Sequence, residues 1–350
     1  MNAPWDAERV FVIAEAGSNW RLGTPARDRR MARLLIDVAV DAGADAVKFQ
    51  TYRPETVYVP NAGQSDYLAA GGIKEDISAI FADLAMPYEL IPELAEYARS
   101  QGITFMSTAF SLPDLAAVDP HVAVHKIASY EISHIRLIEQ VAAAGKPTLM
   151  STGASTAADV AWAVETFRAR SAAPLCLLQC TARYPAPPEA MNLRTIPALA
   201  ARFGLPVGLS DHSPDPLTAP VAAVGLGACV VEKHYTVDRR LPGPDHAFAI
   251  EPHELKAMVR AVRDAAQMRG TGEKVVLPAE AELAAYARRG VQAIRAISAG
   301  EALREGVNVD ILRPGKQRLG VHPRHLASLE GRPARRDIPL GDGLQPDDWA

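Results

Sequence analysis

Eight short apolar runs recur between residues 10 and 231, and amphipathic helical stretches separate them. The runs cover residues 10–14, 46–49, 103–106, 122–128, 147–150, 175–178, 206–209 and 229–231. β-Rich runs that alternate with helices are typical of βα units around a parallel sheet. Eight such units predict a (β/α)8 TIM barrel, in the α/β class. The alternative is a doubly wound open sheet, which would place ligand groups mainly at one switch point.

Polar side chains mark the end of nearly every apolar run. They are Glu15, Lys48, Thr108, Lys126, Ser129, Ser151, Thr181, Ser210, His212, Glu232 and His234. The C-terminal ends of barrel strands meet at one mouth, and barrel enzymes have their active sites there. The pattern therefore predicts a polar active site at that mouth.

Two histidines follow adjacent predicted strands, beside the ionisable residues Asp211 and Glu232. A single His212 or His234 would more often be a satisfied core residue. As a pair, they favour metal binding or shared acid–base work. Two imidazoles leave positions open for water or a substrate oxygen, which suits Lewis-acid chemistry on a carbonyl. Mn, Fe, Co and Zn all accept such ligands.

Lys48 and Lys126 lie within apolar strands, where a lysine is costly unless it meets an anion. One interpretation is a buried ion pair with Glu15 or Glu131. The other is an anionic ligand, with serine hydroxyls as further donors. Cations and hydroxyls from several strands would suit a phosphate together with a carboxylate. Each hydroxyl taken singly could instead cap a helix.

Composition narrows the class of protein. The 37 basic and 41 acidic residues give a net charge of −4 with no basic block, which argues against nucleic-acid binding. We expect a cytoplasmic protein that does not enter the membrane, because the sequence shows no signal peptide and no apolar run near ~20 residues. Cys176, Cys180 and Cys229 fall in or beside predicted strands and are expected to be free thiols.

The composition changes after Gly270, where a charged, Ala-rich stretch precedes short turn-rich segments. We expect a barrel domain over residues 1–270, a linker over 271–289 and a small, mostly β domain over 290–350. A domain of that size has little core, so we expect it to pack on another surface. The connection over residues 52–86 is long for a βα loop and is expected to be a lid over the mouth.

Motifs along nearly the whole chain then identify a family. In order, they are AEAGSN, DAGADAVKFQTY, STAFS, KIASYE, GKPTLMSTGAS, CTARYPAP, GLSDHS, GACVVEKHYTVD and LPGPDH. They closely resemble the sialic acid synthase family, which condenses phosphoenolpyruvate with an N-acetylmannosamine-type sugar to give a nine-carbon 2-keto acid. The tail ISAGEALREGVNVDILRPG resembles the antifreeze-like (SAF, β-clip) domain of those synthases.

The resemblance implies roles for individual residues. His212 and His234 correspond to ligands of a divalent metal, Mn²⁺ with Mg²⁺ or Co²⁺ as alternatives, and Glu232 lies near the water on that metal. Glu15 or Glu232 would manage the proton of the attacking water. The phosphoenolpyruvate contacts correspond to Lys48, Thr108, Lys126, Ser129, Ser151 and Ser210. The sugar contacts correspond to Glu15, Gln50, Tyr184 and Asp245, and Glu131 is a further candidate for substrate binding. In a domain-swapped homodimer, the partner's C-terminal domain would supply Arg313 to the sugar.

The sequence departs from the family pattern at a few positions: Trp20, Tyr130, Gln179, Ala182 and Gly290. The predicted product is therefore sialic acid or a relative such as legionaminic or pseudaminic acid. One alternative is a synthase that takes a phosphorylated sugar such as arabinose 5-phosphate, which would need more cations in residues 52–86 than Arg53 and Lys74. Another is a catalytically inactive sugar-binding homologue.

Overall fold

The computed structural model describes residues 3–5, 9–64 and 75–349. The chain divides into two compact units, Met1–Gly270 and Thr271–Ala350. Residues 65–74 of the expected lid, with Lys74 among them, lie outside the described residues.

The first unit contains an eight-stranded sheet in which all the paired strands are parallel. Its strands are β1 (Phe11–Gly17), β2 (Ala46–Thr51), β3 (Thr104–Ala109), β4 (His125–Ile127), β5 (Thr148–Ser151), β6 (Leu175–Cys180), β7 (Val207–Asp211) and β8 (Val230–His234). Hydrogen bonds link them in the order β3-β2-β1-β8-β7-β6-β5-β4. The two end strands, β3 and β4, also lie next to each other, so the sheet closes. The predicted TIM barrel is confirmed.

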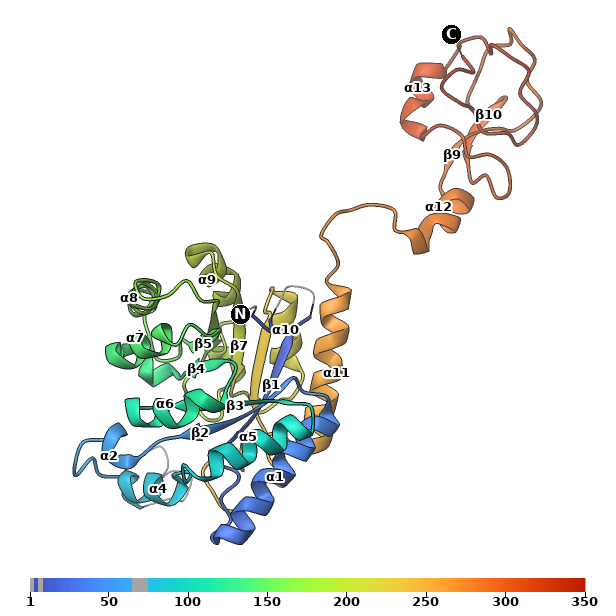
Figure 1. The fold of residues 1–350 in the computed structure, drawn as a ribbon. Helices are drawn as coiled ribbons and strands as arrows, with labels where there is room; N and C mark the ends of the chain where they lie inside the picture. Colours follow the sequence, from blue (N-terminus) through green and yellow to red (C-terminus); the bar gives the residue numbers. More distant parts are fainter. Residues whose placement is uncertain (1–2, 6–8, 65–74, 350) are drawn as a thin grey trace. The chain divides into compact units, whose positions relative to one another are not determined.

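Helices lie outside the strands (Figure 1). They are α1 (Pro25–Ala42), α5 (Leu90–Ser100), α6 (Leu112–Val118), α7 (Ile135–Ala143), α8 (Ala157–Arg168), α9 (Thr195–Phe203), α10 (Thr218–Gly225) and α11 (Pro252–Met268), with short 3₁₀ turns η1 (Asp119–His121), η2 (Ser129–Ser133) and η3 (Pro188–Ala190). Helix α1 illustrates how sequence sets the bounds of an element. It begins with a proline at its first position and ends at Gly43, whose φ of 79° gives the left-handed cap.

Alternate residues of each strand face the barrel interior and the surrounding helices. Val12 and Ala14 belong to the large core beneath the helices, whereas Ile13 belongs to the interior cluster. The interior cluster comprises Trp5, Phe11, Ile13, Ala46, Met106, Val124, Leu149, Cys176, Leu178, Cys229 and Val230. Gly208 is required within it, because a Cβ there would lie 2.7 Å from Leu178 Cδ2 and 2.5 Å from the backbone oxygen of Val230.

The strands extend further than the apolar runs. β1 continues to Gly17, β6 to Cys180 and β8 to His234, so most of the polar residues expected after the strands lie in their last positions. β4 is shorter than its apolar run and begins at His125. The site residues that lie on these strands are consequently held by backbone ladders.

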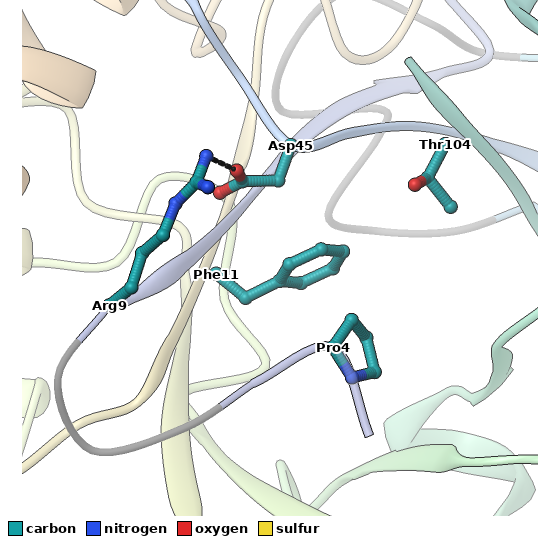
Figure 2. Close-up of a pocket in the computed structure, with 5 residues that line it drawn as sticks. All are labelled: Pro4, Arg9, Phe11, Asp45 and Thr104. Atoms are coloured by element: carbon teal, nitrogen blue, oxygen red, sulfur yellow. Dashed lines mark hydrogen bonds and ion pairs between the residues drawn. The ribbon is translucent and has the colours of Figure 1, made fainter. Parts of the chain in front are cut away.

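The opposite end of the barrel carries a small pocket of about 190 Å³. Figure 2 shows its lining, in which Arg9 pairs with Asp45 at 2.6 Å. Phe11 and Thr104 begin β1 and β3, and Asp45 directly precedes β2, so the pocket is at the N-terminal ends of the strands.

The described part of the insert contains α2 (Pro54–Val57) and α4 (Ile77–Leu84). Ile77, Ile80 and Leu84 form a small apolar cluster with Tyr52. Arg53 joins the two ends of the insert, because its Nη1 donates to the carbonyls of Tyr52 (2.7 Å) and Met86 (3.0 Å).

The second unit begins with η4 (Pro278–Glu280) and α12 (Ala281–Ala287). β9 (Gly290–Ala293) pairs antiparallel with β10 (Val309–Leu312), followed by η5 (Pro323–His325) and α13 (Leu326–Leu329). The unit has its own buried cluster: Val291, Ala293, Ile297, Leu303, Val309, Leu329, Ala334, Ile338 and Leu344. In the described parts of both units, no helix is both long and apolar enough to span a membrane.

Candidate active site

Lys48 is the centre of a buried network at the C-terminal mouth of the barrel. Its Nζ lies 2.6 Å from Glu15 Oε2 and 3.6 Å from Glu232 Oε1. The same Nζ donates to Thr108 Oγ1 at 3.0 Å. These four residues come from four strands that are neighbours in the barrel, β8, β1, β2 and β3. Of the interpretations open for Lys48 from the sequence, the ion pair with Glu15 is present.

Two further residues complete this network. Ser210 Oγ donates to Glu232 Oε1 at 3.2 Å, and Gln50 Nε2 donates to Glu15 Oε1 at 3.0 Å. Glu232 Oε2 is buried and has no hydrogen-bond partner among the described residues. One oxygen of this carboxylate is thus left for a ligand.

Lys126 has a different environment from Lys48. It is buried, and its Nζ donates only to the carbonyl of Ile127, at 2.9 Å. It forms no ion pair with any described residue, so the expected alternative of a pair with Glu15 or Glu131 is not found for this lysine. Since a buried ammonium group needs a counter-charge, Lys126 is the cation best disposed to meet an anionic ligand.

Ser129, Gly153, Cys180 and Ala182 lie close together beside Lys126. The backbone N–H of Gly153 donates to Ser129 Oγ at 3.0 Å. A Cβ on Gly153 would lie 3.0 Å from Cys180 Sγ and 3.2 Å from the Cβ of Ala182. Ala182, where a polar residue is usual in the family pattern, is therefore at the site.

Ser151 and Glu131 each present a buried oxygen with no hydrogen-bond partner in the described parts of the chain. Ser151 ends β5, and Glu131 lies in η2, which follows β4. Unpaired buried polar atoms are rare in folded proteins, and one common explanation is a missing ligand or water. Both atoms are consistent with the predicted substrate contacts.

The two histidines come together as expected. The ring centroids of His212 and His234 are 5.5 Å apart, and the Tyr184 ring packs against His212 with centroids 4.2 Å apart and planes tilted by 39°. His212 Nδ1 lies 2.9 Å from the carbonyl of Thr181. A hydrogen bond from Nδ1–H to that carbonyl leaves the lone pair on Nε2, the arrangement that orients many metal-binding histidines.

These residues fit a divalent ion. Two imidazoles on one ion, each at about 2.1 Å, have centroids about 5 Å apart, close to the observed separation. Burial, together with His212, lowers the pKa of His234 well below its usual value, which favours the neutral ring that a metal ligand needs. Burial also acts on His212, but Cys180 and the carbonyl of Thr181 outweigh it and raise the pKa of that ring, so a metal on His212 would displace a proton. No group of three or more His, Cys, Asp and Glu side chains among the described residues could hold a metal. The protein would supply two ligands and leave the remaining positions open.

Asp245 comes from the loop after β8 and reaches the same site. Its Oδ2 is 4.0 Å from His234 Nδ1 and accepts a hydrogen bond of 3.0 Å from Ser18 Oγ. Gly17, at φ 53°, permits this approach, because a Cβ there would lie 3.0 Å from Asp245 Oδ2 and 3.3 Å from the His234 ring. The segment after β1 and the loop after β8 therefore form one wall of the site.

Burial and neighbouring charges shift the pKa values of the two carboxyl groups near Lys48 in opposite directions. Burial raises the pKa of Glu15 to about 7, with Lys48 opposing the shift. Burial also acts on Glu232, but Lys48 and Lys126 outweigh it and hold its pKa below the usual value. Near neutral pH, Glu15 is thus able to carry a proton while Glu232 is ionised. Paired carboxyls with divergent pKa values are characteristic of acid–base sites.

Several residues singled out in the sequence do not belong to the site. Trp20 is buried in the core beneath the helices. Gln179 is also buried, and its Nε2 donates to the carbonyl of Met191 at 3.2 Å. Asp211, expected beside the histidines, pairs instead with Lys233 at 2.6 Å. The second unit carries Gly290, at the start of β9, and Arg313, which is exposed directly after β10. The expected contact of Arg313 with the sugar in a partner subunit stays a prediction.

Sequence reasoning missed three residues at the mouth: Ser18, Cys180 and Phe248. Ser18 binds Asp245, Cys180 Sγ lies 3.8 Å from His212 Nδ1, and the Phe248 ring packs 5.2 Å from that of His234. The i, i+2 spacing from Cys176 and Leu178 could have placed Cys180 on the inner face of β6. Ser18 and Phe248 lie in loops, where no periodicity points to a partner.

Comparison with known proteins gives the family. The NeuB family profile matches residues 35–274, more than half of the chain. The chain belongs to the NeuB family. The profile of the SAF domain matches residues 288–349. The resemblance to sialic acid synthases and their C-terminal domain, drawn from the motifs, is confirmed.

Relatives within the NeuB family cover almost the full length. The chain is 40% identical to the spore coat polysaccharide biosynthesis protein SpsE of Bacillus subtilis, over 97% of this chain and 93% of that protein. It is 36% identical to the pseudaminic acid synthase of Campylobacter jejuni strain 81-176, over 98% and 97%. A crystal structure of N-acetylneuraminic acid synthetase from Leptospira borgpetersenii, in complex with citrate, matches with a TM-score of 0.69 at 32% identity, over 79% of this chain and 90% of that chain. This NeuB-family chain is thus a condensing enzyme of the transferase type.

Proposed function

We propose that this enzyme joins phosphoenolpyruvate to the open-chain form of an N-acetylmannosamine-type amino sugar, with the help of a divalent metal. The products are a nine-carbon 2-keto acid of the sialic, legionaminic or pseudaminic acid type and inorganic phosphate. The observation that carries the proposal is the convergence of two buried lysines, buried hydroxyls and two histidines at one barrel mouth. Relatives named as synthases of such acids support it.

Phosphoenolpyruvate carries a phosphate and a carboxylate, and the lysines match it in charge. Lys126 has no anionic partner within ion-pair distance in the described chain, and Lys48 has Thr108 beside it. Ser129 adds a hydroxyl group from the turn after β4, and Ser151 and Ser210 add theirs from the ends of β5 and β7. Fixed cations in a buried site stabilise developing charge without reorganisation. We assign the binding and electrostatic stabilisation of phosphoenolpyruvate to this group.

His212 and His234 would hold the metal, Mn²⁺ with Mg²⁺ or Co²⁺ as alternatives. When bound, such an ion supplies Lewis-acid polarisation of the sugar aldehyde. Tyr184 and Asp245 flank the histidines and would orient the sugar, with Gln50 as a further contact. Phe248 and Tyr184 pack near the His234 ring and help to exclude water from it.

The reaction needs a residue that holds a proton. C3 of phosphoenolpyruvate attacks the aldehyde carbon, and the aldehyde oxygen takes up a proton. Water then adds at C2 and loses a proton, and the C2–O bond breaks to release phosphate and leave the keto group. Glu15 suits the proton transfers, because burial raises its pKa to about 7. Glu232, with its pKa held low, suits an ionised role that offsets the lysines.

The decisive experiment follows phosphate release. The protein is incubated with phosphoenolpyruvate, Mn²⁺ and a panel of 2-acetamido sugars, and the keto acid is detected in parallel. We expect release only with both substrates, loss of release on chelation and recovery when Mn²⁺ is restored. His212→Ala is expected to lower kcat by about 10²–10³-fold, whereas His253→Ala, on an exposed position of α11, leaves it unchanged.

Absence of phosphate release with every sugar would favour an inactive homologue. Release that survives chelation would exclude the metal-dependent reaction. Use of arabinose 5-phosphate would favour the phosphorylated-sugar alternative. Against that alternative, Arg53 of the insert already donates to two backbone carbonyls.

We also propose a domain-swapped homodimer in which Arg313 of the partner subunit contacts the sugar. Its support is the family resemblance together with the exposure of Arg313. Arg313→Ala is expected to raise the KM for the sugar more than the KM for phosphoenolpyruvate. Lys316→Ala, exposed nearby, is the matched control. A monomer in sedimentation analysis would contradict the arrangement.

A further inference from the structure

A buried set of polar contacts lies on the outer side of β7 and β8, next to the two histidines. Asp211 and Lys233 face each other across these strands in the parallel register. Side chains alternate along a strand, so these two point away from the interior while Ser210 and Glu232 point into it. Both are almost fully buried, at 1% and 2% exposed.

Lys233 holds both chain neighbours of His212. Its Nζ lies 2.6 Å from Asp211 Oδ2 and donates to the carbonyl of Ser213 at 2.7 Å. Asp211 Oδ1 in turn accepts from the backbone N–H of Ser213 at 2.8 Å. We call Asp211, Ser213 and Lys233 the brace.

The brace begins where the backbone ladder stops. The register between β7 and β8 ends at the pair Asp211 and Lys233, and His212 lies one residue beyond it. Strand pairing therefore does not fix the position of His212 relative to His234. Lys233 links the two positions instead, because it is the chain neighbour of His234 and binds the residues on both sides of His212. His212 is also held by the backbone N–H of Ala186, at 2.8 Å from its carbonyl, and by the carbonyl of Thr181, but neither contact involves His234.

We propose that the brace sets the separation of the two histidines and thereby the affinity of the enzyme for its divalent metal. Asp211, Ser213 and Lys233 are positioning residues in this scheme and touch neither metal nor substrate. The inference rests on the proposed metal site at His212 and His234. Outer residues that orient metal ligands commonly change metal affinity 10–100-fold when they are replaced.

A purely structural role for the brace predicts a different result. Replacing a buried ion pair by apolar side chains of similar size is often neutral for stability. A double variant, Asp211→Leu with Lys233→Met, therefore separates folding from positioning. If the brace served only stability, a folded double variant would keep the metal affinity of the wild-type protein.

The experiment measures Mn²⁺ binding to the full-length protein without substrates, by the loss of the free-Mn²⁺ EPR signal. We expect the folded double variant to bind Mn²⁺ about 10–100-fold more weakly, with an unchanged KM for phosphoenolpyruvate and a lowered kcat at subsaturating metal. Lys233→Arg, which keeps the cation, should recover most of the affinity. Asp211→Asn keeps the shape of the side chain and should cause a smaller loss of Mn²⁺ affinity. This variant replaces the double variant in the test if the double variant does not fold.

Arg263→Met is the matched control at the other end of the barrel. It removes an ion pair between α11 and Asp45, at 2.5 Å, and should lower the melting temperature without changing Mn²⁺ affinity. Wild-type Mn²⁺ affinity in the folded double variant or in Asp211→Asn contradicts the positioning role of the brace and leaves the proposed function standing. A wild-type protein that binds no Mn²⁺ overturns the proposed function and the brace together.

Discussion

The two ends of the barrel interior are built from the same strands and differ in almost every physical property. On β1, Ile13 lies in the apolar cluster, and Glu15, two residues later, lies in the ion-pair network. β5 repeats the change from Leu149 to Ser151. One end therefore contributes close packing. The other holds buried charges, among which Lys126 has no anionic partner within ion-pair distance in the described chain.

The difference shows how stability and function can share one sheet. The N-terminal end buries apolar side chains, Trp5 among them, against one another. The mouth buries Lys48, Lys126 and Glu232 in the same low-dielectric interior, where unpaired charge is costly. We expect substitutions at the mouth to act mainly on catalysis and those at the other end mainly on folding.

The largest expected effect is at Lys126. Lys126→Met keeps the length of the side chain and removes the cation without breaking an ion pair, because among the described residues its Nζ donates only to a carbonyl. We expect kcat/KM for phosphoenolpyruvate to fall by about 10³-fold, since one preorganised charge is lost. Steady-state kinetics measure the change, and an unchanged melting temperature shows that the fold is intact. A loss of less than tenfold would mean that Lys126 does not face the anion.

Leu149→Ala tests the other end of the barrel. The side chain is fully buried in the apolar cluster, so the cavity should cost about 3–4 kcal/mol of unfolding free energy. Urea denaturation measures the cost. At temperatures where the variant is folded, both KM values should match the wild type. A raised KM would show that the two ends are mechanically coupled.

Glu131→Gln tests whether ionisation of the buried Glu131 carboxyl lowers the stability of the fold as the pH rises. Burial raises the pKa of Glu131 to about 7, above its unfolded-state value. A raised carboxyl pKa stabilises the fold at low pH, and this stability is lost as pH rises through the folded pKa. The neutral glutamine avoids the loss, so the gain over wild type should be about 2 kcal/mol larger at pH 8 than at pH 5. Equal gains at both pH values, measured by thermal unfolding, would contradict the shift.

Cys176→Ala is expected to have the smallest effect. Cys176 Sγ packs 3.8 Å from Cys229 Sγ in the apolar cluster, and burial raises the pKa of the Cys176 thiol well above its usual value. Removing one sulfur atom should cost about 1 kcal/mol and leave activity unchanged. Chemical denaturation and the phosphate-release assay check the two parts. Loss of activity would contradict the assignment of the active site to the C-terminal mouth of the barrel.

Much of the architecture could be predicted from the sequence because strand periodicity is local. The apolar runs predicted the barrel, and the residues that end them, such as Lys48 and His234, do lie at one mouth. The same local view failed at Asp211. It adjoins His212 in sequence but faces the opposite side of the strand, where Lys233 binds it. Trp20, noted as a departure, is likewise a core residue.

The sequence by itself determined the number of barrel strands, their order along the chain and the alternation of side chains between the two faces of each strand. Only the tertiary structure decided which charges meet. Closure of the barrel brings Ser18 to Asp245 across 227 residues of sequence, and β1 beside both β2 and β8, so that Lys48 reaches Glu15 and Glu232. The opposite pKa shifts of those two carboxyls follow from burial and from their distances to the lysines, and both quantities exist only once the barrel has closed.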